Sequence, residues 1–221
     1  MLRTDFMRQP AIIILLVLLV DQTLKFWIKT NMYLGQEFHI AGDWFIIHFT
    51  ENNGMAFGLE FAGEYGKLFL SLFRIVAVIG IGWYLNELVK EKAHRLLIIS
   101  MSLILAGAIG NIIDSTFYGV LFSSSDFRLA EFMPADGGYA TLLHGKVVDM
   151  FYFPIFKGFL PEWVPFWGGD YFIFFRPVFN IADTSISIGV GLILAFQSII
   201  FKKEKSDTTT PEPEGASQQA D

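Results

Sequence analysis

Long apolar stretches alternate with polar segments along this chain. Four of the apolar stretches are candidates for helices that cross a membrane: residues 10–29, 65–88, 95–113 and 178–201. A helix needs about 20 predominantly apolar residues to cross a hydrocarbon layer about 30 Å thick. The pattern therefore predicts an all-α membrane protein with four transmembrane helices.

Basic residues gather on one side of these predicted helices. An even number of crossings puts both termini on the same side. Basic residues cluster on that side at the N-terminus, between the second and third apolar stretches, and after the fourth. The residues are Arg3, Arg8, Lys90, Lys92, Arg95, Lys202, Lys203 and Lys205. Because cytoplasmic loops carry an excess of lysine and arginine, we expect both termini in the cytoplasm and residues 31–64 and 116–177 outside.

The first predicted outer segment has a strand-like pattern. Residues 38–40 and 44–49 are short runs rich in aromatic and β-branched side chains, separated by Ala41-Gly42-Asp43. Such runs on either side of a glycine-containing turn are typical of a β-hairpin. We therefore expect a small β-sheet at the membrane surface.

The second predicted outer segment ends in a stretch crowded with Phe, Tyr and Trp. Pro154, Pro161 and Pro165 interrupt this stretch and argue against a further spanning helix, because proline removes a helical hydrogen bond. Aromatic side chains are enriched where a membrane meets water, so we predict an aromatic-rich outer loop. Residues 1–205 are interpreted as a single domain, and residues 206–221 as a disordered cytoplasmic tail.

Composition agrees with a membrane protein and narrows its chemistry. The 221 residues are 53% hydrophobic and 17% charged, with a formal net charge of −6. Nucleic acid is not an expected partner, because it would select a clustered basic surface. The absence of cysteine excludes disulfides and a cysteine nucleophile, and the four histidines lack metal-ligand spacing. We expect no metal and no cofactor.

Polar residues interrupt the apolar stretches at helical spacings. The pairs are Asp21 with Lys25, Asn111 with Asp114, and Asn180 with Asp183. Residues three or four apart share a helix face, and lipid offers no hydrogen-bond partner, so each pair should face the interior of the bundle. A further acid, Asp149, follows two valines in the second outer segment.

These residues have structural as well as functional interpretations. Asp21 and Lys25 can form an ion pair that offsets their burial, and Asn180 can cap the last helix with Asp183 in its first turn. Two carboxyls in apolar surroundings also suit acid/base chemistry, because burial and mutual repulsion shift their pKa values. From the residues alone, a hydrolase, a proton- or ion-coupled transporter and a non-catalytic scaffold all stay open.

Five short motifs occur in the order found in the lipoprotein signal peptidase family, signal peptidase II. They are Asp21-Gln22-x-x-Lys25, Asn52-x-Gly54-x-Ala56-Phe57, Gly110-Asn111-x-x-Asp114, Val147-Val148-Asp149 and Phe179-Asn180-x-Ala182-Asp183. The chain resembles this family from about Asp21 to Phe201. The resemblance implies an intramembrane aspartic endopeptidase of the bacterial inner membrane. Its expected substrates are diacylglyceryl prolipoproteins, whose signal peptides it removes near the outer face of the membrane.

The resemblance also implies a role for each motif residue. Asp149 and Asp183 are the expected catalytic dyad, with no metal. The expected supporting and substrate-binding residues are Asn52, Gly54, Asn111, Asp114 and Asn180, and the expected structural residues are Asp21 and Lys25. The enzyme is expected to contain a small outer β-sheet cradle and to contact membrane lipid as a monomer.

One position departs from the family pattern. The family commonly has arginine after the acid at Asp114, and here the residue is Ser115. Arg74 lies in the second apolar stretch at a depth similar to that of Asn111, counted from the predicted cytoplasmic turn. We hypothesise that Arg74 supplies the missing cation to the region of Asn111 and Asp114; the alternative is that its side chain extends to the outer interface.

Overall fold

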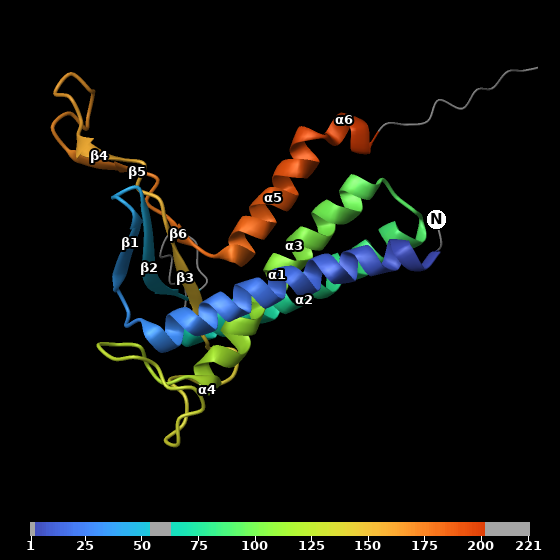
Figure 1. Ribbon diagram of the computed structural model, residues 1–221, viewed down its shortest axis with the longest axis horizontal. Coiled ribbons are helices and arrows are strands. Elements are labelled where there is room, and N and C mark those ends of the chain that lie inside the picture. The colour runs from blue at the N-terminus through green and yellow to red at the C-terminus, as the bar shows by residue number, and fades with distance from the viewer. Residues whose placement is uncertain (1–2, 54–62, 202–221) are drawn as a thin grey trace, which may run out of the picture.

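The computed structural model describes residues 3–53 and 63–201 (Figure 1). Gly54 and the predicted tail, residues 206–221, lie outside the described residues. Within them, three helices are long and apolar enough to cross a membrane: Arg8–Asn31, Tyr65–Lys90 and Arg95–Leu121. The first two belong to α1 (Arg3–Asn31) and α2 (Gly63–Lys90). The third comprises α3 (Arg95–Ile113), the π-helix η2 (Asp114–Tyr118) and the short α4 (Gly119–Leu121).

The last apolar stretch forms a shorter helix than its length predicts. Helix α5 (Ile181–Ala195) has 15 residues, and a separate short helix, α6 (Gln197–Ile200), follows Phe196. The prediction of one helix over residues 178–201 is wrong at its start, because β6 (Val178–Phe179) is a strand. Asn180 is extended, with φ −126°, and caps α5. The described residues therefore contain three helices of spanning length, with α5 as a shorter apolar fourth.

The predicted hairpin is confirmed and forms half of a small antiparallel sheet. Strands β1 (Glu37–Ala41) and β2 (Phe45–Asn52) pair with each other. Strand β3 (Val147–Tyr152) then pairs antiparallel with β2, and β6 pairs with β3, which gives the order β1-β2-β3-β6. The sheet lies at one end of the helices, beside the end of α1 and the start of α5 (Figure 1).

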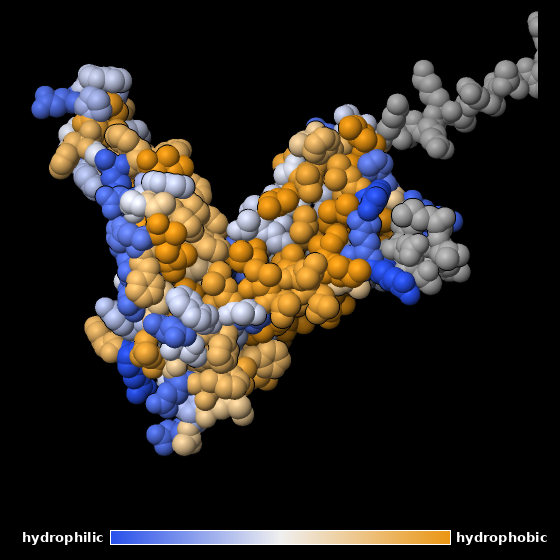
Figure 2. Space-filling view, viewed as in Figure 1, coloured by the Kyte–Doolittle hydropathy of each residue, from blue (hydrophilic) through white to orange (hydrophobic). Residues whose placement is uncertain are grey.

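The aromatic-rich segment, predicted as a loop, contains a second β-hairpin. Strands β4 (Phe156–Phe159) and β5 (Tyr171–Phe174) pair antiparallel and project beyond the four-stranded sheet (Figure 1). Pro161 and Pro165 fall in the turn between the two strands, where proline interrupts no strand pairing. Figure 2 shows a broad hydrophobic surface over the helices with hydrophilic side chains at both ends, as expected for a membrane protein.

Glycines on α3 bring three parts of the chain into close contact. A Cβ atom at Gly107 would lie 2.2 Å from the carbonyl oxygen of Ala182, and one at Gly110 would lie 2.8 Å from Oδ2 of Asp21. Any larger residue at either position would therefore push α3 away from α5 or α1. This packing brings the polar residues of α1, α3 and α5 together.

Candidate active site

Asp149 is the more buried of the two expected catalytic acids. It lies in β3, directly across from Thr50 of β2, and its side chain is 3% exposed. Its carboxyl group accepts a hydrogen bond of 2.7 Å from Nδ2 of Asn180 and another from the side chain of Asn52. Burial, reinforced by the negative charge of Asp183, raises the pKa of Asp149 to about 7. The carboxyl group can therefore hold a proton near neutral pH.

Asp183 reaches the same place from the first turn of α5. Its Oδ1 accepts a 2.8 Å hydrogen bond from Nδ2 of Asn111, and its Oδ2 accepts the backbone N–H of Asn180 at 3.4 Å. Both carboxyl oxygens thus face donors from two different elements. The side chain is only partly buried, so one side of the carboxyl group is accessible.

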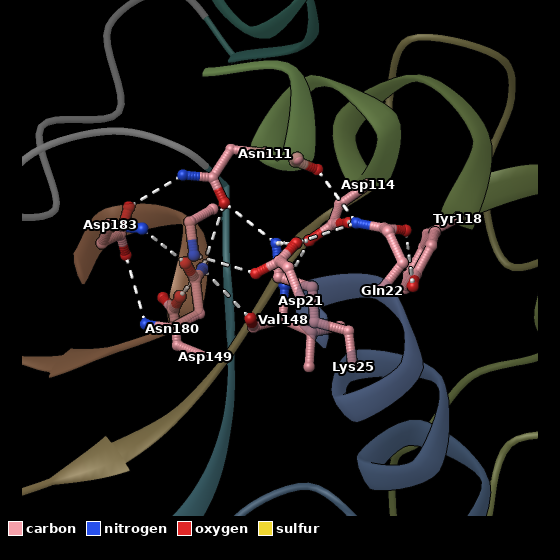
Figure 3. A network of polar contacts seen from close by, with 12 residues as sticks. Asp21, Gln22, Lys25, Asn111, Asp114, Tyr118, Val148, Asp149, Asn180 and Asp183 are labelled. Atoms are coloured by element: carbon pink, nitrogen blue, oxygen red, sulfur yellow. Dashed lines mark hydrogen bonds and ion pairs between the residues drawn. The ribbon is translucent and has the colours of Figure 1, made fainter. Parts of the chain in front are cut away.

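Asn180 connects the two acids (Figure 3). Its Nδ2 lies 2.7 Å from Oδ1 of Asp149, and its Oδ1 accepts the backbone N–H of Asp183 at 2.9 Å. The second contact belongs to a capping box, in which Asp183 and Asn180 each accept the other's backbone N–H. The cap that starts α5 is therefore also the link between the two carboxyl groups.

Lys25 fixes the orientation of Asn111. Its ammonium group, with no exposed surface, contacts Asp21 at 2.9 Å, Asp114 at 2.8 Å and Oδ1 of Asn111 at 3.0 Å. An ammonium group has three N–H donors, and all three have acceptors here. Because Oδ1 of Asn111 accepts from Lys25, its Nδ2 must point away, toward Asp183 (Figure 3).

The acids paired with Lys25 hold the backbone beside the two candidate catalytic residues. Oδ2 of Asp114 accepts the backbone N–H of Val148 at 3.2 Å, one residue before Asp149. Oδ1 of Asp21 accepts the backbone N–H of Ala182 at 2.9 Å, one residue before Asp183. The predicted ion pair of α1 is thus connected to both halves of the site.

Two members of this network were not expected from the sequence. The side chain of Gln22 donates to Asp21, Asp114 and the carbonyl oxygen of Gly110, and the hydroxyl group of Tyr118 donates to Oε1 of Gln22 at 3.1 Å. Gln22 lies inside the first motif, and Tyr118 lies four residues after Asp114. Helical spacing from a buried acid was therefore a signal that could have found Tyr118.

Arg74 lies near the two candidate catalytic acids, and its role as a cation for the Asn111 and Asp114 region stays a prediction. Lys25 forms an ion pair with Asp114. The charge of Arg74 interacts electrostatically with Asp183 first and Asp149 second. Ser115, at the position where the family commonly has arginine, donates to the carbonyl oxygen of Asn111 at 3.0 Å.

A groove of about 500 Å³ opens beside Asp183. It is lined by Phe175, Pro177, Phe179, Asp183, Thr184, Ser187 and Ile188. Most of these side chains are apolar, so the groove offers one carboxyl group at the edge of an apolar surface. Among residues 3–53 and 63–201, no three His, Cys, Asp or Glu side chains are grouped to hold a metal ion. Two carboxyl groups of this kind, of which Asp149 has a raised pKa, can exchange protons with a substrate.

Comparison with known proteins identifies the family. The model of the signal peptidase (SPase) II family matches residues 13–200. A lipoprotein signal peptidase of Porphyromonas gingivalis is 56% identical over 83% of this chain and 80% of its own length. One of Amoebophilus asiaticus is 38% identical over 90% of this chain and 84% of its own length.

Solved structures agree with this assignment. Two structures described as a bacterial membrane enzyme solved by the in meso method superpose with TM-scores of 0.55 and 0.56 at 25% and 26% identity. They cover 89% and 88% of this chain, and the matches span 93% and 94% of theirs. The chain therefore belongs to the signal peptidase II family, whose members are multi-pass membrane proteases that process the signal peptides of lipoproteins.

Proposed function

We propose that this protein is an aspartic endopeptidase that cleaves signal peptides from diacylglyceryl-modified prolipoproteins, with Asp149 and Asp183 as its catalytic dyad. The observation that most strongly supports the dyad is the position of Asn180, whose side-chain amide donates to the carboxyl group of Asp149 and whose backbone N–H donates to that of Asp183. Membership of a protease family argues against the transporter and scaffold alternatives. The reaction type and the dyad are implied by the family resemblance, and the geometry of the two acids supports them.

In this proposal the two acids share one proton before the reaction. Asp149 carries the proton, because burial raises its pKa to about 7. Asp183 is the base, because Asn111 and the backbone of Asn180 donate hydrogen bonds to its carboxylate oxygens and stabilise the negative charge. Two neighbouring carboxyls in such a site do not both ionise at neutral pH.

The bond cleavage needs only water and these two groups. Asp183 removes a proton from a water molecule as its oxygen attacks the scissile carbonyl carbon, and Asp149 donates its proton to the carbonyl oxygen. The resulting tetrahedral diol collapses when Asp183 passes its proton to the leaving nitrogen and a hydroxyl group returns its proton to Asp149. The C–N bond breaks, the acids return to their starting state, and no covalent enzyme intermediate forms.

The apolar groove is the proposed binding site for the signal peptide. Its opening beside Asp183 would bring an apolar segment and its lipid-bearing end to the proposed base. Asn52, Asn111 and Asn180 would orient the acids or the peptide through their amides. A role for Gly54, which lies outside the described residues, stays a prediction from the family motif.

We also propose that α5 and α6 together make a fourth crossing of the bacterial inner membrane, with both termini cytoplasmic. The cluster Lys90, Lys92 and Arg95 between α2 and α3 supports this orientation. The sheet and the two acids would then lie near the outer face. A 15-residue helix spans about 22 Å. The extra turn of α6 helps to complete the crossing.

The dyad can be tested in cells that lack their own signal peptidase II activity. We expect Asp149→Asn and Asp183→Asn each to abolish conversion of a diacylated prolipoprotein to the shorter form on a gel, because each removes one proton carrier. Asp170→Asn is the matched control, since Asp170 is an exposed acid in the β4–β5 hairpin. All variants should reach the membrane in similar amounts. Normal conversion by either dyad variant would exclude the proposed mechanism.

A further inference from the structure

A second buried charge lies one helical turn beyond Lys25. Lys29, in the last turn of α1, has no exposed surface and forms an ion pair with Glu51, whose side chain is 5% exposed. Oγ of Ser125 lies 2.9 Å from the same ammonium group, and the ring centre of Tyr139 lies 4.7 Å from it. A cation buried this completely is costly unless it is paired, so the contact with Glu51 is essential to the arrangement.

Glu51 directly precedes Asn52 in β2, and this order has a geometric consequence. Successive residues of a strand point to opposite faces of the sheet. Thr50 pairs with Asp149, so Thr50 and Asn52 share the face that carries Asp149. Glu51 pairs with Val148 on the other face, where Lys29 lies. At the end of β2, the ion pair of Glu51 with Lys29 thus lies on one face of the sheet. The side-chain amide of Asn52 lies on the other face, where it donates to Asp149.

The neighbouring strand is held by the same cluster. Nζ of Lys146 lies 3.4 Å from Oε2 of Glu51, and the backbone N–H of Lys146 donates to the hydroxyl group of Tyr139 at 2.7 Å. Lys146 directly precedes Val147, the residue that pairs with Asn52. The ends of β2 and β3 that flank Asp149 are therefore held together by one set of contacting side chains, in which Lys29 and Glu51 are buried and Lys146 is partly exposed.

We propose that Lys29 and Glu51 are positioning residues, which hold the end of β2 so that Asn52 keeps its hydrogen bond to Asp149. The inference rests on the proposed function, in which Asp149 is catalytic. It adds a role for two residues outside the five family motifs. The pair acts through Asn52 and does not touch the substrate or the reacting atoms.

The alternative is that the ion pair of Lys29 with Glu51 has a purely structural role and only stabilises the fold. A stabilising pair changes how much enzyme is folded, whereas a positioning pair changes the turnover of each folded molecule. The hydrogen bond from Asn52 lowers the pKa of Asp149, so its loss should move the high-pH limit of activity to higher pH. Asp183, Lys25 and Arg74 also act on Asp149 and stay unchanged in the variants below.

The main test replaces both charges, with Lys29→Met and Glu51→Gln in one chain, so that neither is left buried alone. On purified, folded enzyme in detergent we expect kcat for a lipopeptide substrate to fall about tenfold or more, with KM changed by less than about twofold. The control removes the exposed pair Glu87 and Lys90 with Glu87→Gln and Lys90→Met; these residues are 2.8 Å apart at the other end of α2. This control should keep both kcat and the pH profile.

A double-mutant cycle with Asn52→Ala identifies the route of the effect. If the pair acts through Asn52, the two charge replacements should reduce kcat little further once Asn52 is alanine. An equal further loss would overturn the proposal, as would an unchanged kcat and pH profile in the double replacement itself. If the double replacement does not fold, Glu51→Asp is used instead, because it keeps the negative charge on a shorter side chain. An unchanged kcat and pH profile in Glu51→Asp, or an equal further loss of kcat when it is combined with Asn52→Ala, would then overturn the proposal. Activity in Asp149→Asn would instead overturn the proposed function, so the two failures are distinguishable.

Discussion

Single side chains in this site carry more than one function. Lys25 balances the charge of two buried acids and also fixes which way the amide of Asn111 faces. The amide orientation matters, because only Nδ2 of Asn111 can donate to Asp183. A residue that sequence reasoning classifies as structural is thus two hydrogen bonds away from a proposed catalytic carboxyl group.

The raised pKa of Asp149 predicts a pH limit for catalysis. Its pKa rises from 3.8 to about 7, so the proton needed on the proposed acid is lost as the pH rises through about 7. We expect kcat to fall by about tenfold for each pH unit above that point. A series of single-turnover rates between pH 5 and 9 measures this. A rate that stays constant up to pH 9 would contradict the assignment of Asp149 as the acid.

At the scale of elements, strand pairing and helix capping together build the site. Pairing of β3 with β6 puts Phe151 beside Phe179, and the residue that follows β6, Asn180, therefore reaches the carbonyl oxygen of Val148 and the carboxyl group of Asp149. Asn180 follows the strand and caps α5. The start of a helix and one half of a proposed dyad are thus determined by the same residue.

This double role makes Asn180→Ala informative. Loss of the cap should cost about 1 kcal/mol of stability, whereas loss of the link between the acids should abolish nearly all conversion of the substrate. His94 provides a matched control, because its side chain caps α3 by accepting the backbone N–H of Leu96, at the opposite end of that helix from Asn111. We expect His94→Ala to lose similar stability, measured by thermal unfolding in detergent, and to keep its activity. Equal activities in the two variants would show that Asn180 is only a cap.

At the scale of the whole molecule, the four-stranded sheet, whose β3 carries Asp149, lies at one end of the helices beside the start of α5, which carries Asp183. The α2–α3 turn lies at the other end (Figure 1). The apolar surface between the two ends is continuous over the helices (Figure 2). A molecule of this form can hold its reactive groups near one membrane face while its helices stay in lipid. Under the proposed function, this arrangement would bring the two acids to a cleavage site at the end of a membrane-spanning signal peptide.

The proposed orientation can be tested directly because the chain has no cysteine. We expect a membrane-impermeant maleimide to label Asp43→Cys, in the β1–β2 turn, in spheroplasts with intact inner membranes. Glu91→Cys, in the α2–α3 turn, and Phe201→Cys, after α6, should react only after permeabilisation. Labelling of Phe201→Cys in intact spheroplasts would contradict the fourth crossing, but it would not contradict the other three crossings.

The sequence by itself determined the features that depend on local pattern. Apolar length predicted the three long helices, and a glycine-containing turn between two β-rich runs predicted the β1–β2 hairpin. Helical spacing placed Asp21 with Lys25 on one face, and their ion pair is present in the structure. Each of these depends on contacts between residues close in the chain, where periodicity and turn chemistry are sufficient.

Only the tertiary structure decided which distant residues meet. Asp149 and Asp183 are joined through the pairing of β3 with β6, and the ion pair of Lys29 with Glu51 connects the first helix to the second strand. The same pairing turned Val178 and Phe179 into a strand, although their apolar character suited a helix. Such contacts depend on the register and packing of whole elements, and local patterns of polarity do not encode which elements pair.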